Sequence, residues 1–383
     1  MRNAILSGIG DTKVGRLEGS SVLGLHAEAA FAALDDAGLK LGEIDGLICA
    51  YAMAESYPML ASVFAESVGL MPAYSTSIHS GGASGCTMAM TAAALVESGR
   101  CRHVLCVAGD CRLSGMPRGA ATAALAAFGH PQFEQPYGIG IPAAYALVAR
   151  RYMHDYGATA EQLAAIAVTQ RRHAARHPKA HLTAPITLED VGASRVIATP
   201  LRLLDCCPVS DGGAAFIVSA AETADGLPKP AVRLLGDGQK HTHEHILAAP
   251  SLTAFGCAAS AAQAFGRAGV GPAEIDVAEV YDSFTITLLI ELESVGFFEK
   301  GEAGPAALAG ALDLGGRLPC NTHGGLLSFG HSGAAGGMFH VVEAVRQLRG
   351  EADSRQVAGA ALAFVHGDGG VLSAHCSLVL GRA

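Results

Sequence analysis

The chain has 383 residues, of which half are apolar and 16% are charged, with a net charge of −9 at pH 7. This composition excludes an intrinsically disordered protein, and the length favours two structural units over one. The acidic balance argues against a nucleic-acid partner, because binding to a phosphate backbone needs clustered Lys and Arg side chains. No apolar run reaches the ~20 residues that cross a bilayer, so we expect no membrane span.

The first part of the chain has the pattern of an α/β unit. Residues 1–15 predict a strand and a turn rather than a cleaved signal peptide. Residues 29–47 read as an amphipathic helix ended by glycine, an acidic turn and the start of an apolar strand. A glycine-rich turn at 80–85, SGGASG, then opens a second helix, and the apolar strand HVLCVAGD follows it at 103–110.

Ten cysteines are scattered among apolar residues, and none of them forms a Cys-x-x-Cys pair. Buried free thiols in a reducing compartment, the cytoplasm, explain this distribution best. We therefore expect neither a zinc site nor any other metal.

Residues 111–208 do not share the strand–helix pattern of the segments before and after them. The region is rich in His, Pro and Arg and contains helical stretches. Long insertions in α/β enzymes commonly serve as lids or binding loops, so we interpret it as an inserted loop domain folded over the site. Its histidines, His173, His177 and His181, are expected to be solvated.

A weak internal repeat relates the two ends of the chain. Residues 261–280 repeat the pattern of residues 29–47 at an offset of 231, including a Glu-Ile-Asp turn before the strand. The same order of strand, helix, strand, loop, helix and strand continues in both copies. We infer a duplication with halves at 1–225 and 226–383, whose glycine-opened helices pack together and point their N-termini at a shared site.

The most informative segment is 321–337, NTHGGLLSFGHSGAAGG, directly before an apolar-periodic helix. Glycine costs a helix or strand roughly 0.5–1 kcal/mol, so this density marks a sharp turn or a close approach. Backbone N–H groups at a helix start also attract negative charge. His331 would be presented to a ligand there; a plain glycine-rich turn with solvated histidines is the alternative.

These residues resemble the thiolase superfamily over essentially the whole chain, and most of all its sterol-carrier-protein-type thiolases and thiolase-like lipid-transfer proteins. The resemblance implies a duplicated five-layer α-β-α-β-α fold with an inserted loop domain. It also implies an acyl-CoA substrate. In that family a cysteine at the start of the first-half helix is the nucleophile, a Gly-His-Pro histidine activates it, and a second cysteine near the C-terminus moves the α-proton.

The match to the family motifs is partial. Gly330-His331-Ser332 takes the Gly-His-Pro position, which implies a catalytic His331. Tyr281 begins the motif Tyr-Asp-Ser-Phe where Asn or His is expected, and a tyrosine packed at a strand end is the alternative reading. Gly82 stands in place of the nucleophile, and His366 in place of the second cysteine. Both thiols are missing.

Cys86, one turn further along the first-half helix, reads as a core thiol rather than a substitute nucleophile. What remains is an acid–base set without a nucleophile, which favours retro-aldol cleavage of a β-hydroxyacyl-CoA. Acyl transfer, as in acetyl-CoA acetyltransferases, and a non-catalytic acyl-CoA carrier stay open. The expected site residues fall in two groups. Catalytic roles are expected for His331, Tyr281, His366, Asn321 and His323, and contacts to coenzyme A for Gly82, Ser84, Gly325 and Gly369.

The resemblance also implies a homodimer and, for members that lack the cysteine, a small OB-fold/zinc-ribbon partner protein. Arg171 or Arg176, with one of the inserted histidines, could meet the phosphates of coenzyme A. Nothing in the sequence identifies the acyl group.

Overall fold

The computed structural model describes residues 4–117 and 119–382. Nine strands form one sheet in the order β3-β2-β4-β7-β1-β8-β11-β10-β9, and the inserted region adds a small hairpin of β5 and β6. The strands are β1 Ala4–Asp11, β2 Gly46–Ala50, β3 Tyr74–Ile78, β4 His103–Cys111, β5 Val196–Ala198, β6 Leu201–Arg202, β7 Asp211–Ala220, β8 Val232–His241, β9 Val277–Val280, β10 Leu362–Gly369 and β11 Ala374–Arg382.

The strand order confirms the duplication. In the first half the run β2-β4-β7-β1 has one parallel contact followed by two antiparallel ones. In the second half the run β9-β10-β11-β8 repeats this pattern, parallel and then twice antiparallel. The halves meet where β1 pairs with β8.

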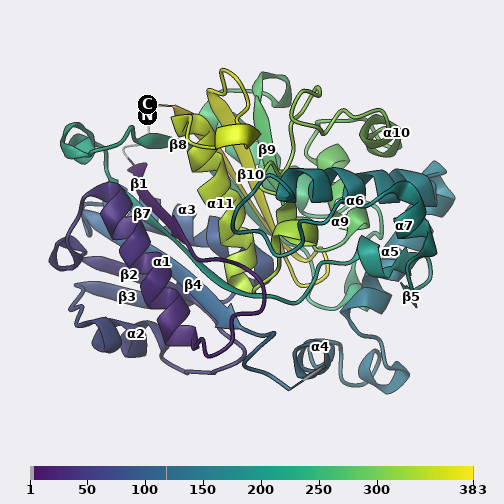
Figure 1. Cartoon of the computed structure of the whole chain (residues 1–383), viewed down its shortest axis with the longest axis horizontal. Coiled ribbons are helices and arrows are strands. Elements are labelled where there is room, and N and C mark those ends of the chain that lie inside the picture. Colours follow the sequence, from purple (N-terminus) through teal and green to yellow (C-terminus); the bar gives the residue numbers. More distant parts are fainter. Residues whose placement is uncertain (1–3, 118, 383) are drawn as a thin grey trace.

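Helices complete five layers (Figure 1). One outer layer, on the first-half strands, has α1 Val22–Ala37 and α2 Leu60–Val68. The central layer has α3 Ser84–Glu97 and α11 Ala334–Arg349, which pack against each other and against both halves of the sheet. The other outer layer, on the second-half strands, has α8 Cys257–Ala268 and α9 Thr285–Ser294. The predicted fold class is therefore confirmed.

The two central helices approach closely because their facing residues are small. A Cβ atom on Gly337 would lie 2.0 Å from the carbonyl oxygen of Gly82, and one on Gly85 would lie 3.0 Å from the backbone of Gly337. Only glycine fits at such a distance. This contact sets the start of α3 against the first turn of α11, as the sequence predicts.

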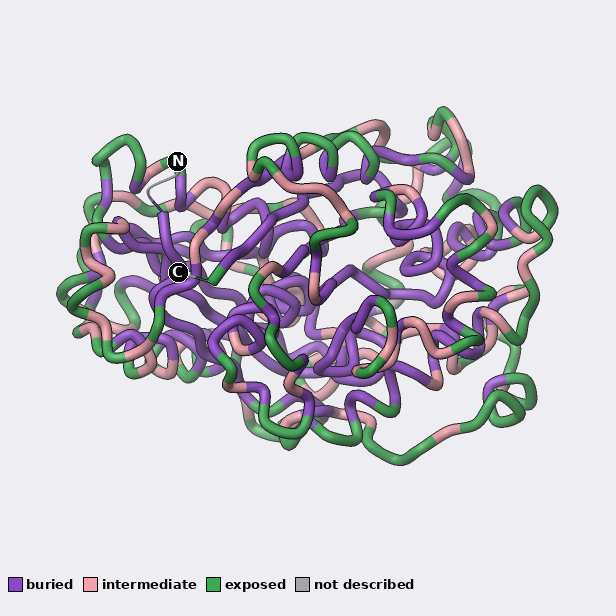
Figure 2. The backbone as a smooth tube through the Cα atoms, turned by 90° about the horizontal axis from the view of Figure 1, so that it is seen from above, coloured by how far each residue is buried: buried purple, intermediate pink, exposed green. Residues whose placement is uncertain are grey.

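The inserted region packs mainly on the second half. Its helices are α4 Ala120–Ala126, α5 Ile141–Tyr156, α6 Ala160–Ala174 and α7 Leu188–Ala193. Side chains of α5 and α6 share an apolar core with α9 and with α10 Ala303–Leu308. Figure 2 shows exposed chain mainly on the outer loops and turns, and buried chain running through the interior. No helix in the described ranges is both long and apolar enough to cross a membrane.

The expectation of solvated histidines in the inserted region is wrong for two of the three. His173 and His177 are buried, and His181 is half-buried. His173 Nδ1 lies 3.2 Å from the carbonyl oxygen of Asn321, and His177 packs edge-on against Phe329. The polar composition of this segment predicts exposed side chains. The prediction fails because α6 is packed between the inserted region and the second-half loop, a tertiary contact that local sequence does not show.

Candidate active site

A tyrosine and a histidine from two second-half loops meet at the start of α3. Tyr281 directly follows β9, and its Oη lies 2.9 Å from Nε2 of His331. A Cβ atom built on Gly82 would fall 2.1 to 2.3 Å from Cε2, Cζ and Oη of Tyr281. The tyrosine ring therefore fills the space that a side chain at position 82 would need.

The loop around His331 is held by its backbone. The His331 N–H donates to Oγ of Ser210 at 3.2 Å, and its carbonyl accepts from the Ser210 N–H at 3.0 Å. Gly330 has a φ of +129°, and a Cβ there would lie 2.6 Å from Val14. The glycine before His331 is thus required by a turn and a close approach, as the glycine density of the sequence predicts.

Arg112, which the sequence did not single out, completes the site. Its Nη1 donates to Nδ1 of His331 at 3.2 Å, and the Gly333 N–H lies 3.3 Å from the same nitrogen. The Arg112 side chain is buried, its Nε has no partner, and no carboxylate within residues 4–117 and 119–382 forms an ion pair with it. Asp110 lies nearby: burial raises the pKa of its carboxyl, and the charge of Arg112 lowers it. A buried guanidinium without a direct ion pair is expensive, so its place beside His331 needs a reason in the chemistry.

The hydrogen bonds assign the proton of His331. Arginine is always protonated and only donates, so Nδ1 must present its lone pair to Arg112. In the neutral imidazole the proton then sits on Nε2 and is donated to Oη of Tyr281. The tyrosine oxygen accepts this bond and keeps its own proton free for another group.

Both groups are uncharged at rest. Burial, and then the charge of Arg112, lowers the pKa of His331 to about 3. Burial raises the pKa of the Tyr281 hydroxyl well above its usual value; nearby Cys207, Asp368 and Tyr51 add to this rise, and Arg112 opposes it. The site therefore rests as a phenol and a neutral imidazole, with one fixed cation behind the imidazole.

Asn321 lies next to this pair but uses its amide on the backbone. Its Nδ2 donates to the carbonyl of Val280 at 2.8 Å, and its Oδ1 accepts from the Val280 N–H at 2.7 Å. Asn321 has a φ of +52°, a conformation that asparagine tolerates better than most residues. These contacts pin the end of β9 just before Tyr281.

His323 sits in a buried group behind the site. Its Nδ1 lies 2.9 Å from Oε2 of Glu279, and its ring packs edge-on against His340. The structure brings His323 to a carboxylate rather than to Tyr281 or His331. A direct catalytic role for it stays a prediction.

His366 lies on β10, and its side chain faces the outer helix layer. Its ring stacks on Phe364 of the same strand face, whereas a Cβ on the neighbouring Gly367 would point at Ala83 of the central layer. Its one contact with the Tyr281–His331 pair is through the backbone, where the Tyr281 N–H donates to the His366 carbonyl at 3.0 Å. Its catalytic role also stays a prediction.

The residues expected to contact coenzyme A lie in tight backbone junctions. Ser84 Oγ donates to the Gly81 carbonyl at 2.7 Å and accepts from the Ser80 N–H, which shapes the turn into α3. A Cβ on Gly325 would meet the carboxylate of Asp282 at 2.0 Å, and one on Gly369 would meet the Ser80 carbonyl at 2.1 Å. These glycines let protein segments approach each other; contacts to coenzyme A stay a prediction.

The thiols near the site are not thiolates. Cys86 is buried in the core of α3, as predicted, and burial holds its pKa well above the usual value. Cys207 lies closer to the site, because its N–H donates to the carbonyl of Ser283 at 2.9 Å, but burial raises its pKa to about 12. The thiolate is the nucleophilic form, so neither cysteine is activated.

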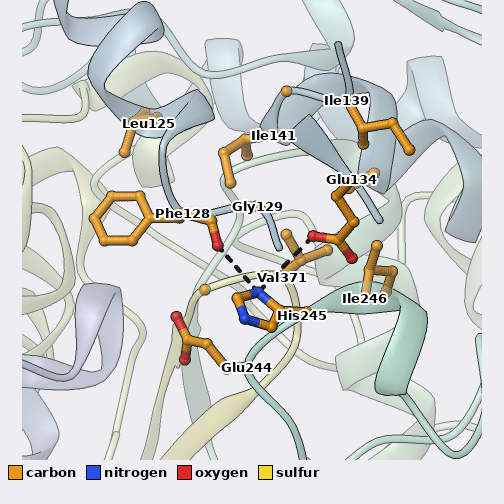
Figure 3. A pocket seen from close by; sticks show the side chains of 13 residues that line it. Leu125, Phe128, Gly129, Glu134, Ile139, Ile141, Glu244, His245, Ile246 and Val371 are labelled. Carbon is orange, nitrogen blue, oxygen red and sulfur yellow. Dashed lines mark hydrogen bonds and ion pairs between the residues drawn. The ribbon is translucent and has the colours of Figure 1, made fainter. Parts of the chain in front are cut away.

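A pocket lies between the loop that follows β10 and the inserted region (Figure 3). It follows the end of β10, which runs parallel to β9, and the inserted region forms its other wall. His245 lies 3.1 Å from the Phe128 carbonyl and 3.8 Å from the Glu134 carboxylate across it. Apart from these, the lining is mostly apolar: Leu125, Ile139, Ile141, Ala144, Ile246 and Val371.

Fold and motifs together define a thiolase-type protein, and family comparison agrees. Residues 3–222 match the model of the thiolase N-terminal domain, and residues 238–382 match that of the thiolase C-terminal domain-like family. The chain belongs to the thiolase superfamily, and it is an enzyme of that superfamily.

Particular relatives refine the picture. The chain is 38% identical to a steroid side-chain-cleaving aldolase of Thermomonospora curvata, over 91% of this chain and 90% of the relative. It is 37% identical to a 17-hydroxy-3-oxo-4-pregnene-20-carboxyl-CoA lyase of Mycobacterium tuberculosis, over 91% and 92%. An acetyl-CoA acetyltransferase of Methanothermobacter thermautotrophicus is 34% identical over 98% and 99%. The solved structure of an Ltp2-ChsH2(DUF35) aldolase superimposes with a TM-score of 0.88 at 36% identity, covering 99% of this chain and 98% of that one.

Proposed function

We propose that this enzyme cleaves a β-hydroxyacyl-CoA by a retro-aldol reaction, with Tyr281 and His331 as its acid–base pair. One observation carries the proposal. The hydroxyl of Tyr281 occupies the space of a side chain at Gly82 and is hydrogen-bonded to His331 at 2.9 Å. A phenol thus stands where the superfamily's acyl-transfer reaction needs a thiol.

Tyr281 first gives its own proton to solvent, because the site rests as a phenol. The tyrosinate then takes the proton of the substrate's β-hydroxyl, the bond between Cα and Cβ breaks, and a ketone or aldehyde leaves. The bonding electrons pass to the thioester as an enolate, and Tyr281 returns the proton to Cα to give the shortened acyl-CoA. His331 stabilises the phenolate by donating from Nε2, and Arg112 supports it through Nδ1.

The enolate oxygen needs hydrogen-bond donors. The amide of Asn321 is already used by Val280. We therefore propose that backbone N–H groups at the start of α11 hold the thioester oxygen, since the first turn of a helix has unused donors and a positive dipole end. In this proposal Asn321 and His323 support the loop and do not touch the substrate.

Acyl transfer is the second candidate, favoured by the acetyl-CoA acetyltransferase relative that matches almost the whole chain. It would need a nucleophile, and the pKa values of Cys86 and Cys207 argue against both thiols. A non-catalytic acyl-CoA carrier would not need the buried, hydrogen-bonded side chains of Arg112, His331 and Tyr281.

We further propose that the enzyme is a cytoplasmic homodimer that works with a partner protein. The family resemblance implies a small OB-fold/zinc-ribbon partner, and we propose a DUF35-type protein. Support comes from the similar solved aldolase, which pairs Ltp2 with ChsH2(DUF35). Acyl-CoA is the proposed substrate class, and the step above uses no metal.

The test incubates the chain, with and without a DUF35 partner, with a β-hydroxyacyl-CoA and separately with a β-ketoacyl-CoA plus free CoA. The 17-hydroxy steroid thioester named for the mycobacterial relative is one suitable probe. Release of a ketone and a shortened acyl-CoA from the hydroxy substrate, lost in Tyr281→Phe, is expected. CoA-dependent shortening of the β-keto substrate that survives in Tyr281→Phe would refute the aldolase assignment.

A further inference from the structure

A second cluster of titratable side chains lies on the far face of β10 from Gly82. Glu291 of α9, His366 of β10 and His375 of β11 converge there, and all three are buried. The retro-aldol step uses none of them. The cluster joins helix α9 of the outer layer to β10 and β11 of the second half.

The hydrogen bonds fix the proton of His366. Ser260 Oγ donates to the carbonyl of Cys257 at 3.0 Å, so its oxygen must accept from Ser377 Oγ, 3.0 Å away. Ser377 has then used its only proton, and its oxygen must accept from Nδ1–H of His366 at 2.8 Å. The neutral imidazole of His366 therefore presents a bare lone pair at Nε2.

The hydrogen bonds also fix the proton of His375. Its Nε2 lies 2.9 Å from the carbonyl oxygen of Leu372, which only accepts, so Nε2 carries the proton. The lone pair of His375 is then on Nδ1. This nitrogen faces Nε2 of His366 at 3.2 Å, so two acceptors point at each other with no proton between them.

The carboxylates around this point have unused oxygens. Both oxygens of Glu291 lack hydrogen-bond partners, and so does Oδ1 of Asp368, which lies 4.0 Å from Nδ1 of His375. Within the described ranges Glu291 makes ion-pair contacts only with the two histidines, and Asp368 only with His375. Buried, unpartnered carboxylate oxygens cost several kcal/mol unless a cation or a proton neutralises them.

The spacing of the three atoms matches a metal ion. Nε2 of His366, Nδ1 of His375 and Oε1 of Glu291 are separated by 3.2, 3.6 and 3.9 Å. The circle through three points with these separations has a radius of about 2.1 Å, which is the length of a zinc–nitrogen or zinc–oxygen bond. We infer that Glu291, His366 and His375 bind a divalent transition-metal ion, for which zinc is the best match, with Asp368 or water as the fourth ligand.

This site differs from the neighbouring buried group of Glu279, His323 and His340. There Oε1 of Glu279 accepts two hydrogen bonds from Thr322, and Oε2 contacts His323 at 2.9 Å. Oε2 also has a hydrogen bond with Nδ1 of His340 at 3.5 Å, so both carboxylate oxygens have partners, although both ring nitrogens of His323 and Nε2 of His340 have none. The oxygens of Glu279 therefore need no cation, whereas those of Glu291 do. The proposal departs from the expectation of no metal, which rested on the absence of cysteine pairs. It also assigns His366 to metal binding, and Ser377 to holding His366 in its metal-binding tautomer.

The test measures metal directly. The full chain, produced without a histidine tag and dialysed against metal-free buffer, is analysed by inductively coupled plasma mass spectrometry. About one zinc ion per chain is expected, since a preformed site in the folded state retains its ion. Reconstitution of metal-free protein with cobalt is expected to give the visible absorption of a low-coordinate Co²⁺ site with nitrogen and oxygen ligands. Metal-free protein is expected to unfold at a lower temperature.

Variants locate the ion. Glu291→Gln and His375→Gln are expected to lose the zinc, Ser377→Ala to weaken binding by roughly 10- to 100-fold, and the matched control His323→Gln to keep it. The wild-type measurements decide the matter if a ligand variant fails to fold. Wild type that neither carries zinc nor takes up zinc or cobalt overturns the proposal, as does undiminished zinc in Glu291→Gln. A nitrogen-15 NMR spectrum showing a charged imidazolium at His366 or His375 in the zinc-treated protein would also overturn it, since a proton would then fill the gap.

Discussion

Replacing Gly82 with alanine tests whether the ring of Tyr281 fills the nucleophile position. The added Cβ would lie 2.1 Å from Cε2 and 2.3 Å from Oη of Tyr281. Carbon atoms in contact normally stay about 3.5–4.0 Å apart, so the ring must retreat by more than about 1 Å. The 2.9 Å hydrogen bond to His331 would then be broken. Overpacking of this kind costs about 1–3 kcal/mol, and a displacement of 1 Å costs about 100-fold in activity.

The assay is a double-mutant cycle with Tyr281→Ala, read by urea unfolding midpoints at constant slope. Gly82→Ala is expected to lower the unfolding free energy by about 1–3 kcal/mol in the wild type and by almost nothing once the ring is gone, which gives a coupling of the same size. Gly42→Ala is the control, because a Cβ there meets nothing within 4 Å. Equal costs for Gly82→Ala in both backgrounds would refute the placement of the ring.

Three further predictions follow from charges and thiols. Because Tyr281 acts as tyrosinate, kcat/KM should rise with increasing pH, and Arg112→Met should move this rise to higher pH by about one unit, since the tyrosinate loses the cation behind His331. An unchanged pH profile would contradict the role of Arg112. Cys86→Ala should keep activity within about twofold, and a large loss of kcat would point to acyl transfer. Burial raises the pKa of Asp11, but Arg346 and Lys179 outweigh it and hold the pKa well below its usual value. Its stabilising contribution is therefore present above about pH 4 and lost as the pH falls. Asp11→Asn should destabilise the protein near neutral pH by about 3–5 kcal/mol, and the difference from wild type should begin to shrink only below about pH 4, as followed by thermal unfolding from pH 7 to pH 2.

The sequence was sufficient to predict the fold where its residue pattern is periodic or duplicated. Matching positions at an offset of 231 predict a duplicated fold, which the strand orders β2-β4-β7-β1 and β9-β10-β11-β8 confirm, while the bounds of the two halves stay a prediction. Glycines predicted the close approach of α3 and α11, because the absence of Cβ atoms is itself the packing requirement.

The sequence could not predict which groups individual side chains contact. Arg112 lies 219 residues from His331, in no motif, and only the fold brings the two within 3.2 Å. The sequence predicts a catalytic role for Asn321, which stays a prediction; the hydrogen bonds between its amide and the backbone of Val280 are contacts that spacing alone cannot reveal. The metal site is inferred from histidine tautomers and unpartnered carboxylate oxygens. Both can be assigned only after the fold has placed the side chains.

Gly82 and Tyr281 are best understood as one change made at two positions. In the sequence, Gly82 shows only that the nucleophilic cysteine is missing. Tyr281, 199 residues away, shows only a departure from a separate family motif. In the structure the ring of Tyr281 takes the volume that any side chain at position 82 would require, and its hydroxyl makes the hydrogen bond to His331. A cysteine restored at Gly82 could not occupy that volume while Tyr281 remains, so the nucleophile cannot return by one substitution. The acid–base site is therefore a packed alternative to the thiol site, since the same histidine serves a phenol in place of a thiolate.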